Sequence, residues 1–127
     1  MIKRLKDSEV EKIKEDILGK QYELSFAFIS KNRIKLLNKT YRKKDEPTDI
    51  LSFPLSKNSG EILICKEMAD KKAVKFFPTS QTLRGAREEY ILFLVIHGML
   101  HLKGLHHGDR MEKYELTYYS RYRRRYL

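Results

Sequence analysis

Residues 85–107 read GAREEYILFLVIHGMLHLKGLHH, and the rest of the chain can be arranged around them. Every residue from 91 to 96 is apolar, so a helix formed here is buried nearly all round. Gly104 is a natural end for such a helix, because glycine readily takes the left-handed backbone conformation. The sequence therefore predicts a buried central helix over residues 85–103.

Four further helices are expected on either side of it. Apolar residues at helical spacing predict helices over residues 8–19, 66–75 and 109–126. Another helix begins after Ser30, which can cap it, and ends before Pro47. The last helix carries an apolar stripe of Met111, Tyr114, Tyr118 and Tyr122.

Runs rich in β-branched and aromatic residues predict three strands, at residues 22–29, 50–53 and 61–65. A fourth strand is expected in the first residues or beside Pro54, and residues 78–82 are expected to form a loop. Interleaved helices and strands indicate an α+β (mixed α/β) fold. We therefore expect a single domain over residues 1–127, with about five helices and a small mixed sheet of about four strands.

The charge balance points to a polyanionic partner. The chain has 127 residues, 41% of them apolar, and its 27 Lys and Arg exceed its 17 Asp and Glu by 10. A net charge of +10 on a small domain attracts nucleic acid first. The alternative is an ordinary charged protein surface with no such partner.

A cytoplasmic protein with no membrane segment is expected. The longest apolar run, residues 90–96, is far shorter than the roughly 18 residues that a membrane span needs. Residues 1–7 have no apolar core of a secretory signal. Cys65 is the single cysteine and cannot form an internal disulfide, which also favours the cytoplasm.

All four histidines lie within residues 97–107. His97 and His101 are four residues apart on the predicted helix, so both rings lie on one face. Gly104 lets the chain turn back, and His107 can then supply a third nitrogen. Three imidazoles leave one position of a tetrahedral zinc open, as in catalytic sites. His106 competes for the third place, and the Gly-x-x-His spacing favours His107. The alternative is that the helical histidines are ordinary core residues.

The same spacing occurs in metzincin proteases, but one catalytic residue is missing. Those enzymes have a glutamate general base directly after the first histidine. Here that position is Gly98, which we expect to leave backbone room for substrate beside the metal. A metal site that lacks the protease's glutamate base and belongs to a basic protein suits a phosphodiester substrate better than a peptide substrate.

Three blocks resemble one protein family. Residues 97–107, HGMLHLKGLHH, closely resemble the His-Gly-x-Leu-His-Leu-x-Gly-x-x-His signature of the YbeY family of bacterial single-strand-specific endoribonucleases. Residues 37–54, LNKTYRKKDEPTDILSFP, and residues 60–65, GEILIC, are similar to two further family blocks. The chain departs from the family at His106 and Glu61, where the family usually has aspartate, and it is short for the family.

The resemblance implies a metal-dependent endoribonuclease of ribosomal RNA maturation and quality control, acting at the 3′ end of 16S rRNA. It also implies one zinc-like ion on His97, His101 and His107. The family's important arginine corresponds to Arg42, whose guanidinium can clamp a phosphate. The alternative for Arg42 is a solvated charge at a helix end. Implied partners are single-stranded ribosomal RNA and the ribosome or its small subunit with assembly factors.

Other basic residues are candidates for RNA contact. They are Lys43, Lys44, Arg121, Arg123 and Arg124. The alternative for the C-terminal arginines is a solvated helix end that the helix dipole favours.

The sequence does not decide which group attacks the phosphodiester, and it leaves two other functions possible. The nucleophile is either water activated by the metal or the 2′-hydroxyl of the RNA. Asp49 and Glu61 can assist or serve only a structural role. The competing functions are a non-catalytic ribosome-assembly factor with a structural zinc and, less favoured, a metallopeptidase.

Overall fold

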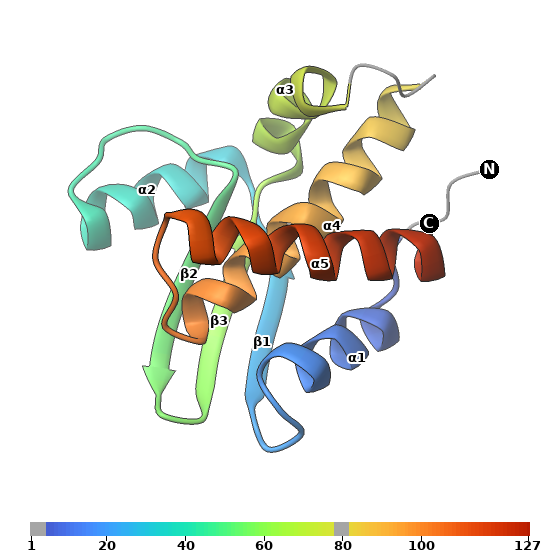
Figure 1. Cartoon of the computed structure of the whole chain (residues 1–127). Coiled ribbons are helices and arrows are strands. Elements are labelled where there is room, and N and C mark those ends of the chain that lie inside the picture. The colour runs from blue at the N-terminus through green and yellow to red at the C-terminus, as the bar shows by residue number, and fades with distance from the viewer. Residues whose placement is uncertain (1–4, 78–81) are drawn as a thin grey trace.

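In the computed structural model, which describes residues 5–77 and 82–127, a three-stranded sheet has helices on both faces (Figure 1). The elements are α1 (Asp7–Ile17), β1 (Glu23–Phe28), α2 (Lys31–Arg42), β2 (Ile50–Ser56), β3 (Ser59–Ile64), α3 (Lys66–Phe76), α4 (Leu83–Leu102) and α5 (Asp109–Tyr126). The predicted α+β class with five helices is confirmed. Of the expected loop at residues 78–82, only Thr82 lies within the described residues.

The sheet is mixed, with strand order β1-β3-β2. β1 runs parallel to β3, and β2 runs antiparallel to β3, so β2 is an edge strand. The expected count of four strands is wrong for the described residues. One of the two suggested places, beside Pro54, is already part of β2, because an edge strand tolerates a proline. The other, at the start of the chain, falls largely on residues 1–4, outside the described part.

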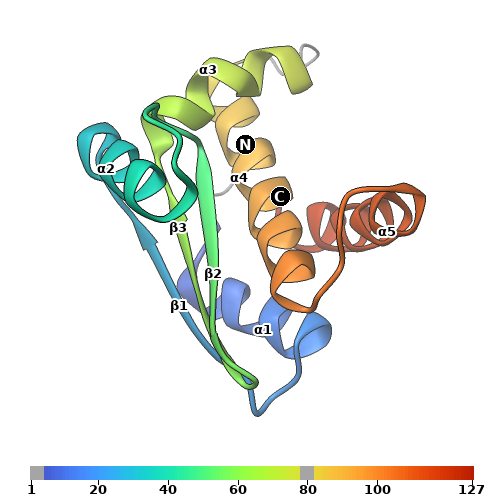
Figure 2. The same cartoon turned by 90° about the vertical axis from the view of Figure 1, so that its left-hand side faces the viewer.

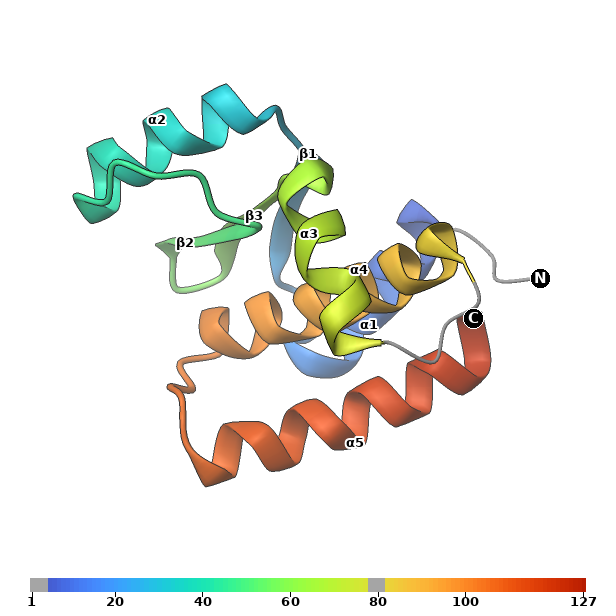
Figure 3. The same cartoon turned by 90° about the horizontal axis from the view of Figure 1, so that it is seen from above.

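The helices form layers around the sheet. Figures 2 and 3 show α2 on one face, α1 and α4 on the other, and α5 beyond α4. α3 packs against α4 near one end of the sheet. The larger core cluster fills the space among the sheet, α1, α4 and α5, and a smaller cluster of Ile34, Leu51 and Cys65 lies under α2. None of the helices in residues 5–77 and 82–127 combines the length and hydropathy that crossing a bilayer requires.

The central helix α4 has well-defined ends. The Thr82 hydroxyl accepts a hydrogen bond from the Gly85 amide at 2.9 Å and so caps the first turn. At the other end Gly104 has a φ of 104°, which favours glycine. The Leu105 amide then donates to the Leu100 carbonyl at 3.0 Å, which closes a Schellman turn. The predicted central helix is confirmed, with its start two residues earlier than expected.

At Gly98, α4 lies close against the sheet. A Cβ atom there would lie 2.9 Å from Ser52 Oγ, 3.0 Å from Ile62 Cδ1 and 3.1 Å from Ile50 Cδ1. The expectation that Gly98 leaves room for substrate is therefore wrong. It leaves room for the side chains of β2 and β3 and brings the histidine end of α4 against the edge strand.

Gly98→Ala should lower the free energy of unfolding by up to about 2 kcal/mol, measured by urea denaturation. Alanine gains about 1 kcal/mol of helix propensity, but overpacking costs about 1–3 kcal/mol. Ile62→Val removes one of the crowded methyl groups, so the double variant should lose less than the sum of the single losses. A Gly98→Ala protein more stable than the parent would contradict this packing account.

Candidate metal centre

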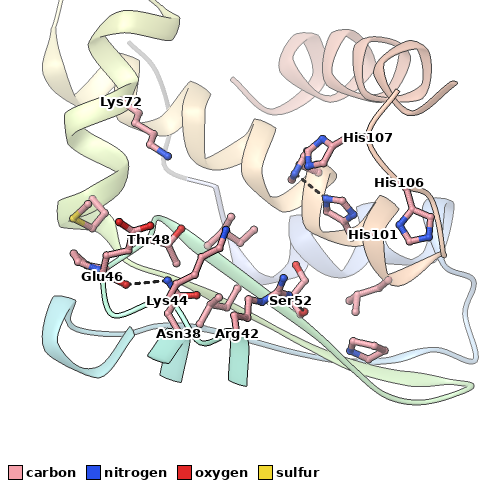
Figure 4. Close-up of a pocket in the computed structure, with 17 residues that line it drawn as sticks. Asn38, Arg42, Lys44, Glu46, Thr48, Ser52, Lys72, His101, His106 and His107 are labelled. Carbon is pink, nitrogen blue, oxygen red and sulfur yellow. Dashed lines mark hydrogen bonds between the residues drawn. The ribbon is translucent and has the colours of Figure 1, made fainter. Parts of the chain in front are cut away.

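Three histidines converge at the end of α4 (Figure 4). His97 and His101 lie on the last turns of α4, and His107 lies in the loop that leads to α5. One ligand nitrogen from each lies within 4.8 Å of the others. The Nε2 atoms of His97 and His101 are 3.0 Å apart, near the roughly 3.3 Å expected for two nitrogens on a tetrahedral zinc. The donor set therefore fits one small divalent ion.

The turn that ends α4 also orients His101. Its Nδ1 donates to the Leu105 carbonyl at 3.1 Å, which leaves Nε2 as the nitrogen with a free lone pair. Burial lowers the pKa of His101, and a positive charge on neighbouring His97 lowers this pKa further. Both effects favour the neutral imidazole, which is the form that binds metal.

His97 is oriented by a carboxylate from another helix. Its Nδ1 lies 2.6 Å from Oε1 of Glu115 on α5. Glu115 is only 8% exposed. A carboxylate behind a metal-binding histidine fixes the ring and raises its basicity. The two helical histidines thus have their Nδ1 atoms engaged and their Nε2 atoms turned toward a common point.

The sequence reasoning missed Glu115, although a signal was present. Met111, Glu115, Tyr118 and Tyr122 share the stripe of α5 that faces the protein, so the glutamate interrupts an otherwise apolar face. Tyr114, which was assigned to that stripe, is 40% exposed. A carboxylate at a position that packing reserves for apolar side chains indicates a buried partner.

His106 does not join the cluster. The group of described residues whose nitrogens can share an ion contains His107 but not His106. His106 still lines the neighbouring cleft, where its ring lies apart from those of His101 and His107 (Figure 4).

The triad opens onto a cleft of about 660 Å³ between the end of α4, β2 and the segment that follows α2. The cleft wall carries Arg42, Lys44 and Lys72, against one acidic residue, Glu46. The cleft is therefore positively charged even before a metal binds, and anionic groups are attracted to it.

Arg42 is the last residue of α2 and lines this cleft. Its Nη2 donates to the Ser52 carbonyl at 3.0 Å, a group on the free edge of β2. Lys43 takes a left-handed conformation with φ of 58° and ends the helix, so that Lys44 returns to the cleft wall. Of these candidates, Arg42 and Lys44 line the cleft, and Lys43 is not among its lining residues.

The C-terminal arginines lie elsewhere. Arg121 forms an ion pair with Asp16 at 2.7 Å, and Arg123 pairs with Glu89. Arg124 lines a separate shallow depression on α5. The structure does not bring Arg121, Arg123 or Arg124 into the histidine cleft.

Asp49 and Glu61, the two carboxylates considered as possible catalytic helpers, make contacts within the fold and do not line the cleft. Asp49 is buried and accepts a hydrogen bond from the Tyr90 hydroxyl at 2.6 Å. Burial, followed by that bond to Asp49, raises the pKa of Tyr90. Glu61 lies within β3, opposite Phe53, and is not among the residues that line the cleft.

Comparisons with known proteins agree on one family. The sequence profile described as "Endoribonuclease YbeY" matches residues 2–122. Proteins named endoribonuclease YbeY from Finegoldia magna and Aquifex aeolicus are 35% and 34% identical over 99 and 122 residues. These alignments cover 72% and 80% of this chain.

The same alignments cover less of some relatives. The chain spans 60% of the Finegoldia magna protein, 64% of the one from Phytoplasma australiense, which is 39% identical, and 77% of the Aquifex aeolicus protein. The solution structure of TM1509 from Thermotoga maritima superposes with a TM-score of 0.62 and 28% identity, covering 93% of this chain and 84% of that one.

Glu115→Gln should weaken metal binding about 10- to 100-fold, because the charge behind His97 is lost while the side-chain shape is kept. Competition with a chelating dye measures this affinity for zinc. Glu112→Gln on the exposed side of α5 is the matched control and should bind like the parent. Equal affinities for both variants would show that Glu115 has no influence on the metal centre.

Proposed function

Since the chain belongs to the YbeY endoribonuclease family, we propose that residues 1–127 form one metal-dependent hydrolase domain that cleaves single-stranded RNA in the histidine cleft. The observation that carries the proposal is the pairing of two features across one cleft. Three imidazole nitrogens converge on one side, and the Arg42 guanidinium lies on the opposite wall. A phosphodiester between them would meet a Lewis acid and a bidentate hydrogen-bond donor.

His97, His101 and His107 are the proposed ligands of one divalent ion, most simply Zn²⁺, because three neutral imidazoles suit zinc. When bound, the ion supplies Lewis-acid chemistry that polarises a phosphoryl oxygen and makes water more acidic. Glu115 and the Leu105 carbonyl hold the rings of His97 and His101 in the orientation that this binding needs.

Arg42 is the proposed catalytic residue of the opposite wall. A guanidinium has five N–H donors, and the Nη2 bond to the Ser52 carbonyl holds this group at the cleft wall. Two parallel hydrogen bonds to a phosphate would orient the substrate and stabilise the charge that develops on its oxygens. Lys44 adds positive charge to the cleft, and so does Lys72, whose Nζ also lies 3.4 Å from Oδ2 of the buried Asp49.

The edge of β2 argues against a peptide substrate. An extended peptide would have to pair with the free edge of this strand, which lines the cleft. The Ser52 carbonyl on that edge already accepts the Arg42 hydrogen bond. The backbone groups of Pro54, two residues further along β2, face the same free edge as those of Ser52. Proline has no N–H, so a peptide would find no donor there. Gly98 also stands where a metallopeptidase would carry its glutamate.

The finer assignments rest on the family resemblance. We propose that the substrate is ribosomal RNA near the 3′ end of 16S rRNA, and that the protein works in the cytoplasm with the ribosomal small subunit and assembly factors. Lys43 and the C-terminal arginines Arg121, Arg123 and Arg124 remain proposed RNA contacts outside the cleft.

Arg42→Ala should lower kcat/KM for a single-stranded RNA about 100- to 1000-fold, because a donor to developing charge is removed. Arg42 is exposed, so metal content and thermal stability should stay those of the parent. Arg33→Ala, an exposed arginine in the first turn of the same helix, is the control. If the two variants cleave at the same rate, Arg42 has no catalytic role.

His101→Ala separates a catalytic ion from a structural one. A catalytic site predicts loss of metal and of cleavage, with a stability loss of only about 1 kcal/mol for the lost Leu105 hydrogen bond. A structural zinc contributes about 10–16 kcal/mol to folding, so the variant would unfold. Metal analysis, RNA cleavage and thermal melting are measured together, with chelation of the parent protein as a parallel test. Unfolding on either treatment would favour the assembly-factor function.

A further inference from the structure

We propose that Tyr41 and Phe53 form a stacking platform for an unpaired nucleobase, directly beside the phosphate site at Arg42. The inference rests on the proposed function and names the part of the RNA that is recognised beside Arg42, next to the cleft. It explains how this domain can prefer single strands, which its positive charges alone cannot do.

The three side chains form one local cluster. The rings of Tyr41 and Phe53 meet edge to face, with centroids 5.5 Å apart and an interplanar angle of 64°. The Arg42 guanidinium carbon lies 5.8 Å from the centroid of the same Phe53 ring. Phe53 is therefore close both to the Tyr41 ring and to the proposed phosphate clamp, Arg42.

Tyr41 is exposed for a reason that lies in the fold. Ile34 and Asn38 on the same side of α2 are buried, but Tyr41 is 67% exposed, two helical turns beyond Ile34. Phe53 lies on the edge strand β2, so the sheet does not continue beyond the pair that Phe53 forms with Tyr41. Neither ring is among the residues that line the cleft, so a large aromatic surface remains open just outside it, next to Arg42.

The chemistry of this cluster fits one nucleotide. Stacking of a base on an aromatic side chain is worth about 1–3 kcal/mol, which corresponds to roughly 5- to 150-fold in affinity. In a duplex the bases are already stacked and paired, and only unpaired bases can turn onto such a ring. A phosphate at Arg42 and its base on Tyr41 would therefore be read together, and only from a single strand.

The test compares two probes that carry the same charge. One is a ten-nucleotide RNA with cleavage-resistant phosphorothioate linkages and 2′-O-methyl groups, and the other is an abasic oligomer of the same length and backbone. Binding to the metal-loaded protein is measured by fluorescence anisotropy. Tyr41→Ala should weaken binding of the base-containing probe about tenfold and leave the abasic probe unchanged within twofold.

Three controls accompany this variant. Tyr41→Phe keeps the ring and should bind both probes like the parent. Tyr114→Ala removes another exposed tyrosine, on α5 and outside the cleft, and should change neither affinity. The salt dependence of binding should be the same for Tyr41→Ala and the parent, because no charge is removed, whereas Arg42→Ala should reduce its slope by about one.

Each result has a distinct meaning. Selective loss of the base-containing probe supports the platform. Equal weakening of both probes by Tyr41→Ala would show that the tyrosine acts only by positioning Arg42, and unchanged binding of both would show that it contacts no RNA; either result overturns the proposal. A parent protein that binds neither probe would overturn the proposed function itself.

Discussion

The close contact between Gly98 and Ser52 is the constraint on which the site depends. Because Gly98 has no side chain, α4 lies directly against the edge strand β2. The residue before Gly98 is the first histidine of the triad, and the carbonyl of Ser52 holds Arg42. One backbone approach therefore sets the distance between the metal side and the phosphate side of the cleft. A side chain at position 98 would separate the two walls, whatever residues they carried.

Negative and positive side chains lie on opposite sides of the histidine triad. Glu115 lies behind His97 in the protein interior, and the cations Arg42, Lys44 and Lys72 lie in front of it along the cleft. A divalent ion on three neutral imidazoles would keep its full charge of two, and the buried carboxylate would offset half of it. The net positive charge of such an ion and Glu115 would face the cationic cleft, where a phosphodiester could balance it. The same order would make the site unfavourable for a positively charged ligand.

Local sequence patterns predicted most of this arrangement, and the two failures at the site, at Gly98 and Glu115, have a common cause. The start of α2 at Ser30 and the end of α4 at Gly104 are set by residues next to them in the chain. The histidines of the triad also lie close together in the sequence, so their spacing can be read directly. The partnership of Glu115 with His97 and the contact of Gly98 with Ser52 join residues that are distant in the chain. The residues around positions 98 and 115 in the sequence do not identify the side chains that pack against Gly98 or bind Glu115. For Gly98 the sequence therefore revealed a missing side chain but not the sheet that requires it.

The net charge of the chain says less about RNA contact than the position of each cation. Arg121 and Arg123 belong to the most basic stretch of the sequence, yet each is paired with a carboxylate on another helix, at Asp16 and Glu89. The Tyr122 hydroxyl also donates to Asp16, at 2.5 Å. These bonds hold the C-terminal half of α5 against α1 and α4, while Glu115 holds its first half at the triad. The basic end of the chain thus helps to keep in place the helix that carries Glu115.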